Sequence, residues 1–330
     1  MCDSLRVLST GKQSLVEFEV EGIPEGDKAR VTEEVANRIQ ESGLANFITK
    51  VVIASDFGAA VERIRGRDGA QPYNPVHDYG RAVAKTIHSV RGGQISFSIV
   101  FDARLFSTSK DEGFLDRQYF IFHELGHVRN RVLRFKNLPE PSPGPAGNKA
   151  EYQRESAWGI WEEYYSERSA AETIAGVCQA VSPGIEVGFA ATLDHADQVL
   201  TYLDGFGTFV RDQVRSFRYR QIDTMELTSS VTNKIRAIVT PLAYVFALEG
   251  LNQRISDKVA QIEKHPNYQT FFQNGWQAIV VALRDWYRDK DTFRRDLLER
   301  AAEGYGGILL SAGLELSDRP HGYYVLVRDV

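Results

Sequence analysis

The chain has 330 residues, of which 43% are hydrophobic and 25% charged, a balance typical of a globular protein that buries a substantial core. The formal net charge of -5 argues against broad nucleic-acid binding, because neutralising phosphates requires clustered lysine and arginine. Cys2 and Cys178 are the only cysteines, which excludes a disulfide framework or a cysteine-rich metal site and favours a reducing compartment.

The first third of the chain mixes strand and helix patterns. The N-terminal residues lack the apolar core of a signal peptide and no apolar run of 18 residues occurs, so we expect a cytoplasmic protein that binds no membrane. Because of the negative net charge, we also expect no nucleic acid as a partner. Alternation in residues 14–21 and the apolar run 50–54 predict strands, whereas residues 30–42 have helical spacing. Residues 79–90 are also interpreted as a helix.

Residues 95–101 alternate between apolar odd-numbered positions and Ser96 and Ser98, which predicts a half-buried strand. An apolar-rich helix is predicted next, from an acidic start at residues 111–112 to about residue 131. Residues 138–148 contain four prolines and two glycines and are typical of an exposed loop.

The second half of the chain is predominantly helical in its pattern. The spacing predicts helices over residues 151–180, 185–221, 224–264 (with a kink near Pro241) and 267–290, and strands within residues 307–330. The composition changes near residue 183, which we take as the boundary between two domains.

Residues 123–127 read His-Glu-Leu-Gly-His and carry the clearest chemical signal. Residues four apart on a helix lie one above the other, so His123 and His127 can bind one cation from the same side. Glu124 is rotated about a quarter-turn from His123 and can reach a metal-bound water without being a ligand itself. This pattern predicts a catalytic zinc site, one Zn²⁺ per chain, with Glu124 as general base and acid.

A third ligand must come from elsewhere, and the next helix offers Glu163 and Glu167. Both lie on an apolar stripe of the helix that includes Ile160, Ala170 and Ile174. An unpaired carboxylate is costly to bury on such a stripe. One glutamate would bind the metal and the other would hydrogen-bond a ligating histidine. Glu162 falls with Ser166 and Ser169 on a face expected to be solvated. The alternative is that Glu163 and Glu167 form salt bridges with Arg129 or Arg131 and bind no metal.

A His-Glu-Leu-Gly-His motif followed by a glutamate-bearing helix resembles the gluzincin arrangement. More narrowly, residues 30–180 are similar to ImmA/IrrE-type peptidases, whose second helix reads Glu-x-x-Ala-Asn-x-Phe-Ala. The resemblance implies cleavage of regulatory proteins, often phage or stress-response repressors. No fused helix-turn-helix domain, common in relatives, is evident here.

The resemblance also bears on the third ligand. Starting the pattern at Glu167 puts Ala170 on its alanine, whereas starting at Glu163 puts Ser166 there. The first register keeps a small residue one turn after the ligand, so it favours Glu167, with Glu163 as the alternative. The Glu167 register departs from the family pattern at its other fixed positions. The Glu163 register keeps Ala170 on the last alanine of the pattern and departs at the other fixed positions.

Two further roles are assigned by analogy with zincin folds. The strand at residues 95–101 would be the sheet edge to which an extended substrate adds, with Ser96 and Ser98 bordering the cleft; an ordinary interior strand is the alternative. His321 and Tyr323, in the C-terminal region, are candidates for stabilising the oxyanion.

The sequence therefore predicts an α+β fold: a zincin-like metallopeptidase domain with a small mixed sheet over residues 1–182, then a mostly helical region with a short β tail over residues 183–330. The predicted activity is zinc-dependent hydrolysis of peptide bonds, acting on a specific regulatory protein. The alternatives are a zinc hydrolase of short peptides or non-peptide amides, and a regulatory interaction protein with a structural or vestigial zinc site. Expected partners are a protein or peptide substrate and a regulatory partner bound by the helical half.

Overall fold

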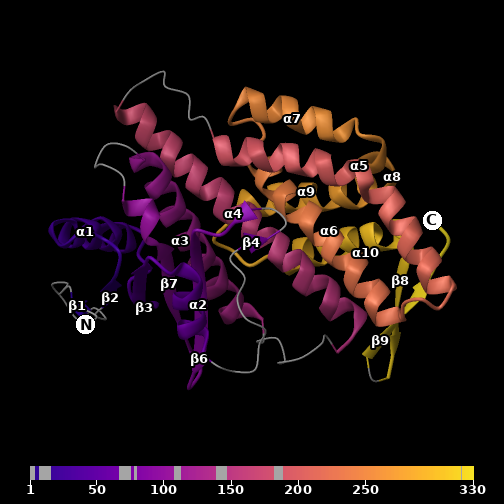
Figure 1. The fold of residues 1–330 in the computed structure, drawn as a ribbon, viewed down its shortest axis with the longest axis horizontal. Coiled ribbons are helices and arrows are strands. Elements are labelled where there is room, and N and C mark those ends of the chain that lie inside the picture. Colours follow the sequence, from indigo (N-terminus) through magenta and orange to yellow (C-terminus); the bar gives the residue numbers. More distant parts are fainter. Residues whose placement is uncertain are drawn as a thin grey trace. The chain divides into compact units, whose positions relative to one another are not determined.

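The computed structural model describes residues 4–6, 16–66, 76–77, 80–107, 113–138, 147–181, 189–320 and 322–330 (Figure 1). The fold is mixed α+β, as predicted, with a small mixed sheet and a C-terminal β hairpin. Two compact units are present, a first unit of residues 1–136 and 169–185 and a second unit of residues 137–168 and 186–330. The predicted division after residue 182 assigned residues 137–168 to the N-terminal domain, whereas they cluster with the second unit.

The first unit is built on one five-stranded sheet in the order β1-β2-β3-β7-β6, with a separate two-stranded ladder of β4 and β5. Its strands are β1 (Ser4–Arg6), β2 (Glu17–Val20), β3 (Ile48–Ala54), β4 (Val76–His77), β5 (Gly80–Arg81), β6 (Ala84–Arg91) and β7 (Gln94–Asp102). Its helical elements are α1 (Glu25–Glu41), α2 (Phe57–Arg65), the 3₁₀ turn η1 (Ala103–Phe106) and α3 (Phe114–Asn137), whose last residue is counted with the second unit.

Strand pairing makes β6 the edge strand on the side of the sheet that carries β7. β3 pairs with β2 and β7 in parallel, and β7 pairs with β6 in antiparallel register, Thr86 lying opposite Ile99. The prediction that residues 95–101 form a sheet edge is therefore wrong. β7 is an interior strand, hydrogen-bonded on both sides, as its buried odd-numbered residues and buried Val100 require.

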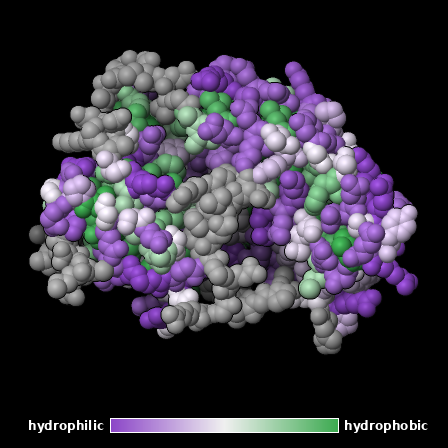
Figure 2. All heavy atoms as spheres, viewed as in Figure 1, coloured by the Kyte–Doolittle hydropathy of each residue, from purple (hydrophilic) through white to green (hydrophobic). Residues whose placement is uncertain are grey.

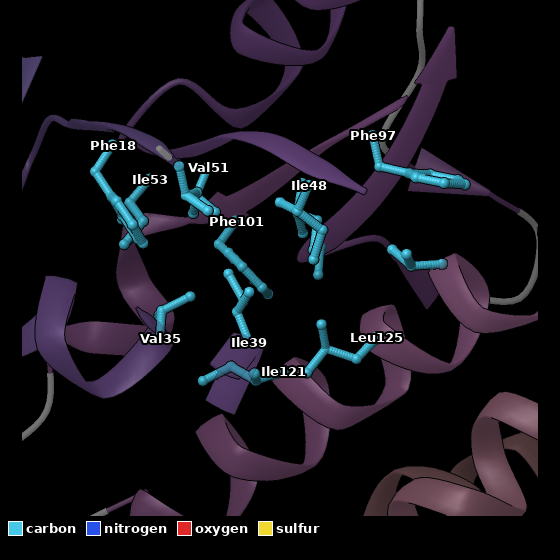
Figure 3. Close-up of a cluster of buried hydrophobic side chains, with 14 of the residues drawn as sticks. Phe18, Val35, Ile39, Ile48, Val51, Ile53, Phe97, Phe101, Ile121 and Leu125 are labelled. Atoms are coloured by element: carbon cyan, nitrogen blue, oxygen red, sulfur yellow. The ribbon is translucent and has the colours of Figure 1, made fainter. Parts of the chain in front are cut away.

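The two faces of the sheet pack against different helices. The face of Phe97, Ile99 and Phe101 belongs to a core with α1 and α3, which Figure 3 shows with Ile121 and Leu125 pointing toward the sheet. The opposite face, which includes Val100, packs against α2. Because side chains alternate along a strand, Ser96 and Ser98 lie on the α2 side and face away from α3.

Residues 84–91 form strand β6, so the prediction of a helix over residues 79–90 is wrong. β6 and β7 form a hairpin whose two turn residues, Gly92 and Gly93, both have positive φ, 57° and 74°. A two-residue turn of this kind matches the right-handed twist of the strands and is strongly favoured by Gly-Gly. The tertiary pairing with β7 outweighs the weak helical spacing of the segment.

The predicted helix ending near residue 131 is confirmed as α3, which continues to Asn137. Its predicted acidic start at residues 111–112 and most of the proline-rich segment 138–148 lie outside the described residues. The predicted helix over residues 151–180 is confirmed as α4 (Lys149–Val181), which contributes residues 149–168 to the second unit and residues 169–181 to the first.

The second unit is mainly helical and ends in the β8–β9 hairpin drawn in yellow in Figure 1. Its remaining elements are α5 (Ala190–Arg218), α6 (Thr224–Ala247), α7 (Gln253–Glu263), α8 (Pro266–Phe271), α9 (Gln273–Tyr287), α10 (Arg295–Ser311), β8 (Leu314–Arg319) and β9 (Gly322–Val327).

One helix over residues 224–264 was predicted, and this is wrong. α6 ends at Ala247, with Pro241 inside it, and α7 begins after Asn252, whose side chain accepts a hydrogen bond from the Ile255 amide at 3.2 Å. Gly250 between them has a φ of 81°, which a helix cannot contain. Asn252 is thus the N-cap that starts a new helix.

Helices α9 and α10 cross at two glycines. A methyl group at Gly275 would collide with the Gly304 carbonyl oxygen and lie 2.7 Å from the Ile308 Cγ1 atom. At Gly307, on the same helix as Gly304, the nearest atom to such a methyl would be 3.7 Å away, an ordinary contact. The close approach of the two backbones therefore depends on Gly275 and Gly304.

Hydrophilic side chains cover much of the face seen in Figure 2, with exposed hydrophobic residues in small separate groups. Within the part of the chain that the structure describes, none of the helices combines the length and the apolar character needed to cross a membrane.

We expect Gly275→Ala to lower the free energy of unfolding by about 1–3 kcal/mol, because the added methyl overpacks the α9–α10 crossing. Gly307→Ala is the matched control and should be neutral or stabilising by up to about 1 kcal/mol, since alanine is the better helix former. Urea unfolding followed by tryptophan fluorescence measures both, because all four tryptophans lie in the second unit. Equal stability of the two variants would contradict the packing described.

Candidate metal centre

Helix α3 presents two different faces. Four of its buried residues form the apolar stripe that packs against the sheet: Ile121, Leu125, Val128 and Val132. Their spacing in the sequence places them within about 60° of one another around the helix axis. At 100° per residue, His123 and His127 project about 200–240° away from Ile121, on the side of α3 that faces away from the sheet. Packing of the stripe thus determines where both imidazoles point.

The two imidazoles converge. The Nε2 atoms of His123 and His127 are 3.2 Å apart, and the rings are inclined at 71° with centroids 4.9 Å apart. Two nitrogen ligands of a tetrahedral zinc ion, each at about 2.0–2.1 Å, lie about 3.3–3.4 Å from one another. The observed separation therefore suits two ligands of one ion.

Glu124 lies on the flank of α3, between the apolar stripe and the imidazoles. Its side chain is buried, with 6% of its surface exposed. Its Oε2 atom accepts a hydrogen bond of 2.6 Å from the Thr86 hydroxyl, on the edge strand β6. The hydroxyl also lies 3.3 Å from the Glu124 carbonyl oxygen. Thr86 thus holds one carboxylate oxygen in place through a contact between the sheet and the helix.

His123, Glu124 and His127 form a group that could hold a metal ion, with one ligand atom from each lying within 4.8 Å of the others. Imidazole nitrogens suit zinc, copper, iron and nickel, whereas magnesium and calcium prefer oxygen. The donor set and the nitrogen separation fit a zinc ion bound by the two histidines.

Glu163 and Glu167 lie in the second unit, where each accepts a hydrogen bond from a hydroxyl group. Thr192 Oγ1 donates to Glu167 Oε1 at 2.9 Å, and the Tyr244 hydroxyl donates to Glu163 Oε2 at 2.9 Å. Glu167 is 4% exposed, whereas Glu163 is half-buried. The assignment of Glu167 or Glu163 as the third ligand stays a prediction.

Glu162 is 5% exposed, so the prediction of a solvated position is wrong. Ser166, expected on the same solvated face, is also buried. The cause is that α4 is buried around most of its circumference in this region, and a single apolar stripe does not describe its surroundings.

The predicted substrate-binding and oxyanion residues are Ser96, Ser98, His321 and Tyr323. Ser96 and Ser98 are in the interior strand β7, with Ser96 Oγ 3.0 Å from Ser89 Oγ, so they do not border a substrate edge. His321 lies outside the described residues. Tyr323, in β9, packs against Tyr152 with ring centroids 5.6 Å apart, and burial raises the pKa of its hydroxyl. Its role at an oxyanion stays a prediction.

Thr86 is the residue at this centre that the sequence pattern did not single out. It was missed because residues 79–90 were assigned to a helix, which hides the alternation of buried Ala84 and Thr86. The Gly92-Gly93 turn, placed before a clearly alternating strand, was the available signal for a hairpin.

Comparisons of the chain with protein-family models, with curated proteins and with solved structures give no match.

We expect His127→Ala to weaken zinc binding by more than the roughly 10- to 100-fold that loss of an outer hydrogen-bond partner costs, because it removes a direct ligand. A chelator competition titration on the full chain measures the zinc Kd. His265→Asn is the control, since it removes an imidazole of the second unit but keeps a good N-cap for α8. Equal zinc affinity of His127→Ala and wild type would contradict the assignment.

Proposed function

We propose that this chain is a zinc-dependent hydrolase that cleaves peptide bonds, with His123 and His127 as metal ligands and Glu124 as general base and acid. The observation that carries the proposal is the convergence of the two imidazole nitrogens to 3.2 Å beside a buried, hydrogen-bonded carboxylate. The resemblance of the His-Glu-Leu-Gly-His helix to gluzincins supports the same chemistry.

Zinc bound by His123 and His127 would supply a Lewis acid and lower the pKa of a bound water to about 7. A catalytic zinc ion takes three protein ligands and leaves a position open, so the proposal requires a third ligand, for which Glu167 is the predicted residue and Glu163 the alternative.

In this proposal Glu124 moves the proton. Thr86 occupies Oε2, so Oε1 is the atom that takes the proton from the attacking water. Burial of the carboxylate keeps bulk water away from the transfer and strengthens its electrostatic effect. The same oxygen then delivers the proton to the departing amine, which completes peptide hydrolysis.

The edge strand β6 supports a polypeptide substrate. β6 stands at the end of the strand order, and its residue Thr86 contacts the Glu124 carboxylate. An extended peptide that adds to this edge would pass beside the general base. This assigns to β6 the role predicted for residues 95–101.

Two alternatives also contain a zinc site: a regulatory protein with a structural zinc ion, and a hydrolase that acts only on small substrates. A structural zinc site normally has four protein ligands and no need of a general base. A hydrolase of short peptides or non-peptide amides would share the zinc and Glu124 but would act only on small substrates. Intact protein and short peptides of matched sequence, tested side by side, separate this second rival from the proposal.

We expect Glu124→Gln to bind zinc like wild type but to lose about 10²- to 10⁴-fold in kcat/KM, the usual contribution of a general acid–base group. Cleavage of a mixed peptide library, followed by mass spectrometry, measures activity on many sequences at once. Hydrolysis by Glu124→Gln at the wild-type rate would contradict the proposal.

Thr86→Val should lower kcat/KM by about 10- to 100-fold, because a hydrogen bond to a charged group contributes about 1.5–3 kcal/mol. Thr49→Val is the matched control, since Thr49 donates to a backbone carbonyl, that of Phe97, within the same sheet.

Zinc bound at one ion per chain without cleavage of any peptide or protein would favour the structural-site rival.

A further inference from the structure

The β8–β9 hairpin, drawn in yellow in Figure 1, is a separate sheet in which β9 pairs with β8 alone among the described strands. The Arg328 amide donates to the Gly313 carbonyl at 2.9 Å, so these two residues form a hydrogen-bonded pair next to the ladder. In an antiparallel ladder such pairs alternate with pairs that do not bond to each other. Every second residue of β9 therefore turns its backbone amide and carbonyl away from β8: Tyr323, Val325 and Val327.

The sequence of β9 lacks the features that usually protect an edge strand, which are charges, proline and bulges. The edge strand β6 of the first unit carries Lys85 and Arg91, and β8 carries Glu315 and Asp318. By contrast, β9 reads Gly-Tyr-Tyr-Val-Leu-Val and carries no charge. Its aromatic and β-branched residues favour a strand that packs against neighbours. The composition of β9 is thus that of a strand paired on both sides.

The two strands of the hairpin are buried to different degrees. On β8, Leu314 is 1% exposed and Leu316 is 5% exposed. Val327 and Val325 lie directly opposite these leucines, on the same face of the hairpin, and are only half-buried. On the other face of β9, Leu326 is 44% exposed. The apolar side chains of β9 are therefore less covered than those of β8, as expected of a strand that lacks a neighbour on one side.

We propose that β9 pairs with β9 of a second copy of this chain, in antiparallel orientation, with the two Val325 residues opposite each other on a two-fold axis. In this register Tyr323 of each copy faces Val327 of the other. These are the residues whose amides and carbonyls point outward, so each opposed pair exchanges two backbone hydrogen bonds. Tyr324 then faces Leu326 of the other copy, which covers the exposed leucine.

The uncharged sequence of β9 favours a second copy as the occupant of this edge. In a symmetric pairing a charge near the axis would lie close to its own copy, and like charges opposite each other are destabilising. Pairs of an aromatic and a β-branched residue, such as Tyr323 with Val327, are favourable. Two-fold dimers with one self-complementary surface are also the commonest assemblies. The sheet would run in the order β8-β9-β9-β8, and its outer strands would be the charged β8 strands, which protect an edge.

Sedimentation velocity of the full chain tests the pairing. A single strand pair is a small interface, so we expect a dimer at about 100 µM that dissociates on dilution to about 1 µM. Leu326→Lys should raise the dimer Kd about 2- to 30-fold, because the two-fold axis repeats the altered cross-strand pair. Leu310→Lys is the matched control, since Leu310 is similarly exposed, at 48%, but lies on α10. It should leave the Kd unchanged.

Val325→Pro removes an outward amide at the proposed axis and should abolish the dimer at about 100 µM. Proline is tolerated on an edge strand where the N–H faces away from the ladder, so the β8–β9 pairing should survive. Thermal unfolding checks that it does. If this variant has a lowered Tm, Leu326→Lys still decides the question, because its side chain is exposed.

Disulfide trapping in a Cys2→Ser background tests the register, since Cys178 is buried. Opposed residues of a non-hydrogen-bonded pair have Cα atoms about 4.5 Å apart, within the range that a disulfide bridges. A mixture of Tyr324→Cys and Leu326→Cys chains should therefore crosslink on oxidation. Either variant alone should crosslink little, because its two cysteines would be diagonal neighbours about 7–8 Å apart.

A wild type that stays monomeric at about 100 µM would overturn the proposal and leave a strand of another protein as the occupant of β9. Equal weakening by Leu326→Lys and Leu310→Lys would also overturn it, because the contact would then not be specific to the strand edge. Crosslinking of Leu326→Cys alone as efficiently as the mixture would contradict the symmetric register. None of these measurements depends on zinc, so their outcome is separate from that of the proposed function.

Discussion

The apolar stripe of α3 against the sheet is the contact on which the candidate centre depends. Ile121, Leu125 and the residues that continue their stripe belong to one core with Phe97 and Phe101 of the sheet, and this packing sets the rotation of the helix about its axis. Once that rotation is set, the imidazoles project from the opposite side and Glu124 lies at the flank. The same burial that stabilises the first unit therefore orients His123, Glu124 and His127. A substitution in this core would change the geometry of the candidate centre.

Thr86 connects the sheet to the candidate centre through its hydrogen bond to Glu124. Without the hairpin turn at Gly92 and Gly93, β6 would not lie beside β7, and the Thr86 hydroxyl would not reach the Glu124 carboxylate. Glu124 is thus oriented by tertiary structure, whereas the separation of His123 and His127 follows from helix geometry alone. The second unit repeats the arrangement, because Thr192 and Tyr244 orient the carboxylates of α4. Hydroxyl-to-carboxylate hydrogen bonds are the common device.

Local patterns predicted the features that local geometry determines. The α3 helix, the α4 helix and strand β3 follow from periodicity, and the histidine pair follows from its spacing. The place of β7 in the sheet depends on its pairing with the distant strand β3, so β7 was assigned to the sheet edge. β6 was assigned to a helix because the local signal of its hairpin turn, Gly92-Gly93, was missed. Burial around the whole of α4 made Glu162 a buried residue, which no single-helix pattern predicts. Thr86 and Thr192 donate hydrogen bonds to carboxylates 38 and 25 positions away, which spacing within one helix cannot reveal.

Zinc K-edge X-ray absorption on the zinc-loaded full chain tests the central claim most directly, because it reports the atoms bound to the ion. The account predicts a four-coordinate ion with two imidazole ligands, nitrogen and oxygen neighbours at about 2.0–2.2 Å, and no sulfur. A spectrum without imidazole scattering, or with a zinc–sulfur distance of about 2.3 Å, would contradict the assignment of His123 and His127 as ligands.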